Sequence, residues 1–206
     1  MSLTRRSLLI AFPLALPLAT AAQAQPAPPT APIAALNAAL QAAMKSGRAT
    51  PFATRAAKFR PAAERAFDLP AILAASVGTR FASFPDAAKR DLLEAFTAFT
   101  VATWVSNFDT DGGDIFEVTP QTRTSGTDEI VSTRIVPKSG DPTRLDYVMR
   151  NTQAGWRAID ILLNGTISRV AVQRSDCRTL LAAGDPAPLL ASLRDRADRL
   201  AAGSKP

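Results

Sequence analysis

The fold class is decided by one stretch of the sequence, the seven residues RLDYVMR at positions 144–150. Its apolar residues Leu145, Tyr147 and Met149 stand at every second position, and charged residues occupy most of the positions beside them. This alternation is typical of a β-strand with one buried face and one face in water. Because antiparallel sheets commonly have one packed and one solvated face, the stretch predicts an antiparallel sheet.

Three further segments extend this sheet to four strands. Residues 129–136 and 156–163 have strand patterns, and only short turns separate them from the first strand. A short strand is expected around Phe116, at a sheet edge, because Pro120 lacks the N–H that a central strand would need. Connections this short join antiparallel neighbours. We therefore predict a four-stranded antiparallel sheet within residues 115–163.

Apolar residues at intervals of three and four predict helices on both sides of the sheet. They are expected at about residues 33–46, 51–65, 68–78, 83–107, 167–182 and 185–200. Pro61 predicts a bend in the second helix, and Asp68 stands where an N-cap of the third would be. This order predicts a single α+β domain over residues 33–202, with helices flanking the sheet. An apolar cavity would form wherever the helices leave the inner face of the sheet uncovered.

The N-terminal residues 1–24 have the order of a cleaved secretory signal. Arg5 and Arg6 precede an apolar run at residues 8–18, and Ala22-Gln23-Ala24 offers a cleavage site. The paired arginines leave both the general and the twin-arginine export routes open. An uncleaved anchor is the alternative, although the apolar run is much shorter than the roughly 20 residues that span a bilayer. We expect a periplasmic protein, in which the Pro/Ala-rich residues 25–32 form a flexible leader.

The composition excludes several classes of site. The chain has no histidine and a single cysteine, Cys177, so Ser–His, Cys–His and zinc–histidine sites and an internal disulfide are impossible. The formal net charge is +6, and removal of the two arginines in residues 1–24 leaves +4. No Lys/Arg-rich run follows the pattern of a nucleic-acid contact. The mild positive charge favours transient contact with an anionic membrane surface.

An acidic loop at residues 109–114 is the one candidate metal site. As an EF-hand loop it fails, because its fifth, sixth and twelfth positions hold Gly113, Asp114 and Pro120. These positions need an oxygen ligand, a glycine and a glutamate. The loop therefore predicts a solvated turn, and no metal or other cofactor is expected.

Three further features leave alternatives open. Asp160 lies in an apolar strand, so we expect it to be paired with an arginine or with backbone N–H groups. Contact with a ligand head group and a general-base role are the alternatives. Cys177 is either a small buried side chain or a reactive thiol. The aromatic residues at helical spacing after residue 95 form either a helix core or the wall of a ligand cavity.

Two segments resemble a known family, the MlaC or toluene-tolerance family. The first runs from Phe67-Asp68-Leu69-Pro70 through Val77-Gly78 and Phe81 to Phe96-Thr97-Ala98-Phe99. The second is GWRAIDILLNGTIS at residues 155–168, and its continuation VAVQRS at residues 170–175 resembles the hopanoid-associated HpnM branch. The resemblance covers roughly residues 33–202. Phe81, Trp104 and Cys177 depart from the family's usual residues, each by an exchange between apolar types.

This resemblance implies a periplasmic lipid carrier and not an enzyme. The lipid, a hopanoid or a phospholipid, would lie in the cavity and be shuttled between the inner and outer membranes. Its partner would be an inner-membrane transporter, of RND type for the HpnM branch or of MCE/ABC type for MlaC. A lipid-free adaptor of a transport complex is the alternative.

The expected lipid-binding residues face one another across an elongated cavity between the long helix and the sheet. They are Phe81, Phe96, Phe99, Trp104, Leu145, Tyr147, Met149, Ile159 and Ile161. The inward face of the last strand is not determined by the sequence, which leaves Ile159 and Ile161 the weakest members. Asp160 and Arg174 are expected to act as structural or head-group residues.

Overall fold

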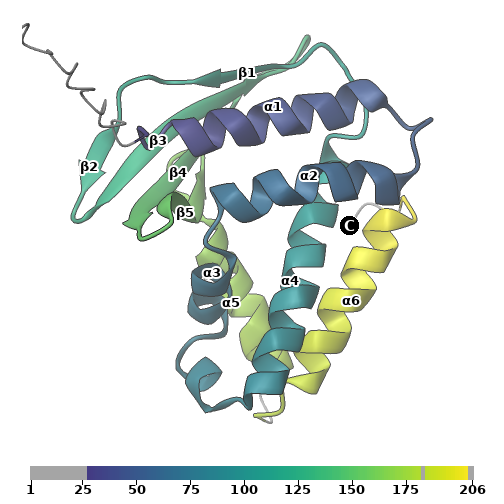
Figure 1. Ribbon diagram of the computed structural model, residues 1–206, viewed down its shortest axis with the longest axis vertical. Helices are drawn as coiled ribbons and strands as arrows, with labels where there is room; N and C mark the ends of the chain where they lie inside the picture. The colour runs from purple at the N-terminus through teal and green to yellow at the C-terminus, as the bar shows by residue number, and fades with distance from the viewer. Residues whose placement is uncertain (1–26, 182–183, 204–206) are drawn as a thin grey trace, which may run out of the picture.

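The computed structural model describes residues 27–181 and 184–203 and shows an α+β arrangement. The predicted signal at residues 1–24 lies outside the described residues. Helix α1 lies over the sheet with α2 beside it, and α3 to α6 extend away from the sheet as a bundle (Figure 1). Their bounds are α1 Ala31–Ser46, α2 Phe52–Ala66, α3 Leu69–Val77, η1 Thr79–Ser83, α4 Asp86–Asn107, α5 Arg169–Leu180 and α6 Ala187–Ala201.

The sheet has six strands in the described residues, so the prediction of four strands was wrong in number. The strands are β1 Ile115–Val118, β2 Arg123–Ser125, β3 Asp128–Val136, β4 Thr143–Thr152, β5 Gly155–Leu163 and β6 Ile167–Ser168. Their order is β1-β3-β4-β5-β6, with β2 also paired to β3, and every strand pair is antiparallel.

The two unexpected strands, β2 and β6, are short and have local causes. β1 and β2 pair with successive parts of β3, and Pro120 falls in the break between them because it has no N–H for the ladder. After β5, Asn164 and Gly165 both adopt positive φ, at 51° and 76°. Two such residues turn the chain tightly back, which brings Ile167 opposite Leu163.

Two helix boundaries differ from expectation, and a third helix continues through an internal proline. α1 begins at Ala31 with Pro32 in its first turn, so the last two residues of the predicted leader are helical. α2 continues as a single helix through Pro61. α5 begins at Arg169 because the two residues before it belong to β6. The expected N-cap is confirmed, since the Asp68 carboxylate accepts a hydrogen bond from the Ala71 N–H at 3.1 Å.

An aromatic chain joins the sheet to the helices and fills the space between them. The Phe67 ring lies 6.3 Å from the Tyr147 ring on β4 and 6.1 Å from the Trp104 ring on α4. Trp104 also meets Phe59 on α2, at 6.4 Å, and stacks on Phe108 at 5.9 Å. Aromatic pairs at these separations add to the free energy gained by burying the rings.

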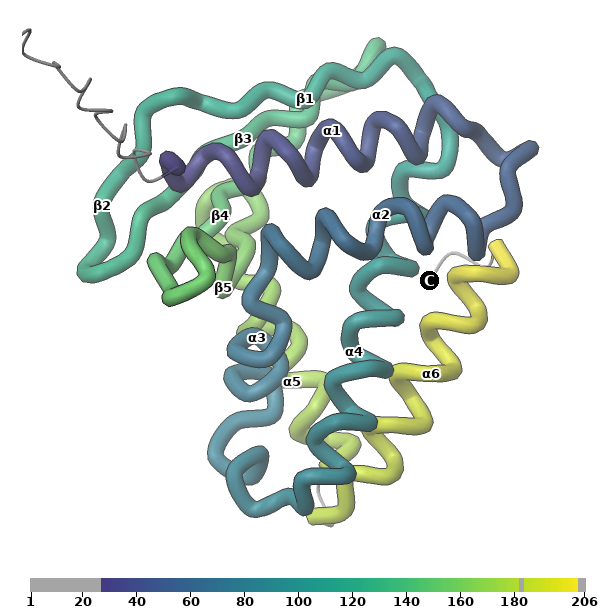
Figure 2. The backbone as a smooth tube through the Cα atoms, viewed as in Figure 1, coloured from purple at the N-terminus to yellow at the C-terminus, as the bar shows by residue number. Residues whose placement is uncertain are grey.

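The bundle is built around α4, which runs alongside α6 (Figure 2). Leu189 and Leu193 of α6 are buried, as are Leu92 and Phe96 of α4. None of the described helices is long and apolar enough to span a membrane.

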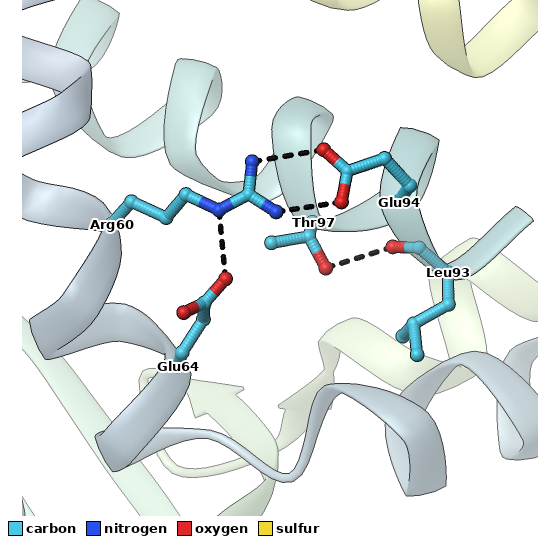
Figure 3. Close-up of polar contacts among 5 residues, drawn as sticks. All are labelled: Arg60, Glu64, Leu93, Glu94 and Thr97. Atoms are coloured by element: carbon cyan, nitrogen blue, oxygen red, sulfur yellow. Dashed lines mark hydrogen bonds and ion pairs between the residues drawn. The ribbon is translucent and has the colours of Figure 1, made fainter. Parts of the chain in front are cut away.

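One arginine ties α2 to α4 on the surface of the molecule. The Arg60 guanidinium donates two hydrogen bonds to the Glu94 carboxylate, at 2.7 and 2.9 Å, and a third to Glu64 at 2.7 Å (Figure 3). These hydrogen bonds lower the pKa of Glu94 below its usual value and raise that of Arg60. On the neighbouring turn of α4, Thr97 donates its hydroxyl to the Leu93 carbonyl at 2.7 Å.

We expect Arg60→Met to lower the free energy of unfolding by no more than about 1 kcal/mol at neutral pH, because partly exposed ion pairs are screened by water. Since the folded state lowers the pKa of Glu94, the pair stabilises the protein above the unfolded glutamate pKa of about 4.3 and loses its effect at lower pH. Urea unfolding of both proteins should therefore show their difference shrinking as the pH falls.

The matched control is Lys58→Met, which removes an exposed charge from the same helix. A difference between wild type and Arg60→Met that is the same at neutral and acidic pH would contradict this assignment.

Candidate functional site

Three adjoining spaces lie among the sheet and the helices α3 to α6. The inner hollow, of about 50 Å³, lies between β5 and the helices, and its lining includes Phe96, Trp104 and Ile161. The middle hollow, of about 20 Å³, lies between α4, α5 and α6. The outer groove, of about 760 Å³, opens between the same three helices. Neighbouring spaces share lining residues, so the three lie in a row from the surface toward the sheet. They are separate hollows in this structure, and we call the row of three the path.

The shared residues stand between neighbouring spaces of the path. Phe96 lines the inner and middle hollows, and Phe99, one turn further along α4, lines the middle hollow and the outer groove. Gln173 of α5 lines all three spaces. Its side-chain oxygen accepts a hydrogen bond from the Ser76 hydroxyl of α3 at 3.1 Å, which fixes its position.

The polarity of the lining changes along the path. The inner hollow is surrounded mostly by apolar side chains from α3, α4, β5 and α5. The outer groove has apolar residues Phe99, Val172 and Leu200, together with four charged residues. These charged residues are Arg169, Asp176, Arg196 and Arg199. An amphiphile with a hydrocarbon part and a charged part matches this gradient.

The space between the long helix and the sheet is much smaller than expected. An apolar cavity of several hundred Å³ was predicted there, but the inner hollow holds about 50 Å³. The rings of Phe67, Trp104 and Tyr147 occupy the interface instead. Most of the open volume lies between α4, α5 and α6. Residue patterns show which faces oppose each other, but they do not show how wide the gap is.

The structure brings together only some of the predicted lipid-binding residues. Phe96, Phe99, Trp104 and Ile161 line the path, whereas Tyr147 and Met149 are buried in the core with at most 1% exposure. The other predicted residues lie away from the described path; these are Phe81 in η1, packed on Phe84, Leu145 on β4, and Ile159 at a register shift in β5.

Arg174, a predicted head-group residue, lies on another side of α5. Its guanidinium sits against Gly78, where an added Cβ would approach Nη2 to 3.3 Å. With Arg178 it lines a separate surface hollow beside the end of α3. The side chains that do charge the groove, Arg169, Arg196 and Arg199, were not predicted. Of these, Arg169 stands within the GTISRVAVQRS run, and the other two share one face of the last helix.

Asp160 holds the start of α5 against β5. One carboxylate oxygen accepts hydrogen bonds from the N–H groups of Ile161 and Val170, at 2.7 and 3.1 Å. The other accepts from the Ser168 hydroxyl at 2.5 Å, and Ser168 in turn caps the Ala171 N–H at 2.9 Å. The charge is thus paired with backbone and hydroxyl donors. Among the described residues, no arginine forms an ion pair with the Asp160 carboxylate.

The acidic loop and the cysteine have structural surroundings. Asp109 forms an ion pair with Arg48 at 2.7 Å, and Asp111 accepts the Gly113 N–H at 3.1 Å, as in a turn. Within the described residues, no three His, Cys, Asp or Glu side chains are grouped so that they could hold a metal ion. Cys177 is 8% exposed, and burial raises the pKa of its thiol, which disfavours the reactive thiolate.

The fold and the three spaces together define an α+β protein with small apolar hollows beside the sheet and a charged groove at the surface. The family model for the MlaC protein matches residues 34–195, and the chain belongs to this family of periplasmic, non-enzymatic lipid-binding proteins.

Its fold is also similar to that of a phospholipid-binding protein from Ralstonia solanacearum, solved in complex with a phospholipid. The TM-score is 0.73 at 16% identity, over 85% of this chain and 99% of the other. A search of curated protein sequences gave no match.

We expect Asp160→Ala to lower the free energy of unfolding by about 1–3 kcal/mol, because it leaves donors at the start of α5 without their charged acceptor. Asp160→Asn should cost less, since its side-chain oxygen still accepts. Urea unfolding followed by circular dichroism measures both. Asp141→Ala, at an exposed turn aspartate, is the control. Unchanged stability of Asp160→Ala would contradict the role given to this carboxylate.

Proposed function

We propose that the protein carries a single lipid through the periplasm, between the inner and outer membranes. Hydrocarbon would occupy the path from the outer groove toward the inner hollow, and the polar head would stay at the groove. The path is the main support for this function. Phe96 and Phe99 line it between an arginine-bearing groove and an apolar hollow beside the sheet. Burial of apolar surface gives about 25 cal/mol per Å², so a lipid tail gains ample free energy there.

The proposal requires α5 and α6 to separate, because the inner and middle hollows hold only about 50 and 20 Å³. In the closed form a weak link crosses the groove, an ion pair between Arg196 on α6 and Asp176 on α5 at 3.4 Å. Both side chains are about half exposed, so the pair stabilises the closed form little. Separation of the two helices would join the three spaces into one cavity.

Two classes of lipid are candidates for the ligand, phospholipids and hopanoids. A phospholipid fits the similarity in fold to the phospholipid-binding protein from Ralstonia solanacearum. A hopanoid fits the resemblance of residues 165–175 to the HpnM branch. The two assignments imply different inner-membrane partners, an MCE/ABC-type transporter for the first and an RND-type transporter for the second.

A lipid-free adaptor is the second candidate function. The closed aromatic interface favours it, because Phe67, Trp104 and Tyr147 already form a filled core. Organic extraction of the purified protein, followed by mass spectrometry, separates the two candidates. Stoichiometric lipid supports the carrier. An empty protein that also takes up no lipid from vesicles supports the adaptor.

We expect Val172→Asp to reduce co-purifying lipid by at least about tenfold, a factor that needs only ~1.4 kcal/mol. Val172 lines the groove and is 41% exposed, so the variant should fold, yet a carboxylate would meet the hydrocarbon. Phe99→Asp, deeper in the path, should lose lipid more completely. Mass spectrometry of the extracts gives the lipid per protein.

The matched control is Ile115→Asp, which makes the same kind of change at a 58% exposed position on β1. Folded Val172→Asp and Phe99→Asp proteins that keep their lipid would show that the tails lie elsewhere.

A further inference from the structure

We propose that Arg169, together with Arg196 and Arg199, forms a subsite for the phosphate of an anionic lipid head group. This inference rests on the proposed lipid-carrier function and narrows it to one class of lipid, the phosphate-bearing one. The subsite lies at the rim of the outer groove, where α5 and α6 face each other.

Arg169 stands where the polar and apolar parts of the path meet. It is the first residue of α5, it lines both the inner hollow and the outer groove, and it is solvent exposed. Among the described residues its side chain has no ion pair or hydrogen bond, so its guanidinium is available to a ligand. A lipid whose tail enters the inner hollow would place its head beside this side chain.

The other two arginines approach the groove from α6. Arg196 and Arg199 are three residues apart and therefore share a helix face. Arg196 pairs with Asp176 across the groove at 3.4 Å, and Arg199 pairs with Asp195 on its own helix. Three arginines and one aspartate line the groove, and with Asp195 counted beside Arg199 an excess of one positive charge remains. Such an excess favours an anion.

The backbone of α5 does not supply this positive charge. A free helix N-terminus binds anions through its N–H groups, but Asp160 and Ser168 already accept from the Val170 and Ala171 N–H groups. The anion would therefore be held by guanidinium groups. Arginine suits a phosphate, because its planar fork of donors matches the phosphate oxygens.

The subsite separates the two lipid classes. The hydrocarbon of a phospholipid and that of a neutral hopanoid would both be stabilised by the apolar lining of the path. Only the phospholipid has a phosphate, which the three arginines at the outer groove would stabilise. A lipid with the same acyl chains but no phosphate should therefore bind more weakly.

The test compares two soluble short-chain lipids that differ only in the head, dioctanoyl phosphatidylglycerol and dioctanoylglycerol. Purified protein is incubated with each, and occupancy is measured by native mass spectrometry. Soluble lipids avoid any effect of charge on docking to a vesicle. The variants are Arg169→Gln and Arg199→Gln, both at exposed positions. Arg178→Gln is the matched control, because it removes one exposed arginine from α5 outside the groove.

We expect the wild type to prefer phosphatidylglycerol. Each groove variant should bind this lipid about three- to tenfold more weakly, as befits the loss of one partly exposed charge-assisted contact, and should bind dioctanoylglycerol as before. Arg178→Gln should bind both lipids like the wild type. Arg169→Lys, which keeps the charge, should recover part of the loss.

Other outcomes overturn the subsite. Unchanged phosphatidylglycerol binding in both groove variants would overturn it and leave the carrier function standing. Equal loss of both lipids would show that the arginines shape the groove and do not read the phosphate. Arg169-dependent binding of inorganic phosphate without either lipid would show a free-phosphate site. A wild type that binds neither lipid nor phosphate would instead refute the proposed function.

Discussion

The arrangement of the whole ligand path depends on the carboxylate of Asp160. It joins the centre of β5 to the first turn of α5, through two backbone N–H groups and the Ser168 hydroxyl. This fixes where α5 leaves the sheet, and α5 supplies one wall of all three spaces. A half-buried carboxylate without such donors would destabilise the strand, so the same contacts that satisfy the charge also position α5.

The strands that could be predicted from the sequence are those long enough to show alternating apolar residues. Tyr147 and Met149 are buried and Leu145 packs against the same core, as the alternation imposed by the pleat predicts. The other face was predicted to lie in water, but its Asp146 is fully buried, where Arg144 and Arg123 pair with it. β2 and β6 were missed because three- and two-residue strands are too short to show a period. A signal for β6 was present in Asn164-Gly165, a pair that favours the positive φ of tight hairpins.

The ligand path was predicted less well, for a different physical reason. Its apolar wall on α4 follows from spacing within one helix, so Phe96, Phe99 and Trp104 could be chosen. The charged groove is made by α5 and α6 together, and the relative placement of two helices is set by tertiary packing. Arg169 and Arg199 therefore look like ordinary exposed arginines in the sequence. The width of the gap between helix and sheet depends on how the aromatic rings pack. The spacing of residues in the sequence does not show this packing.

The packing also explains how one fold can have both a solid core and a ligand path. The rings of Phe59, Trp104, Phe67 and Tyr147 contact one another in turn and tie α2, α4 and the sheet together. α6 packs closely on α4 but touches α5 much less, and the ion pair between Arg196 and Asp176 bridges them across the groove.

The opening proposed for lipid uptake is therefore expected between α5 and α6, where the interface is smallest and fewest apolar contacts would be lost. The aromatic rings would then keep their contacts, and the volume would change on the side where Phe99 and Arg169 line the outer groove.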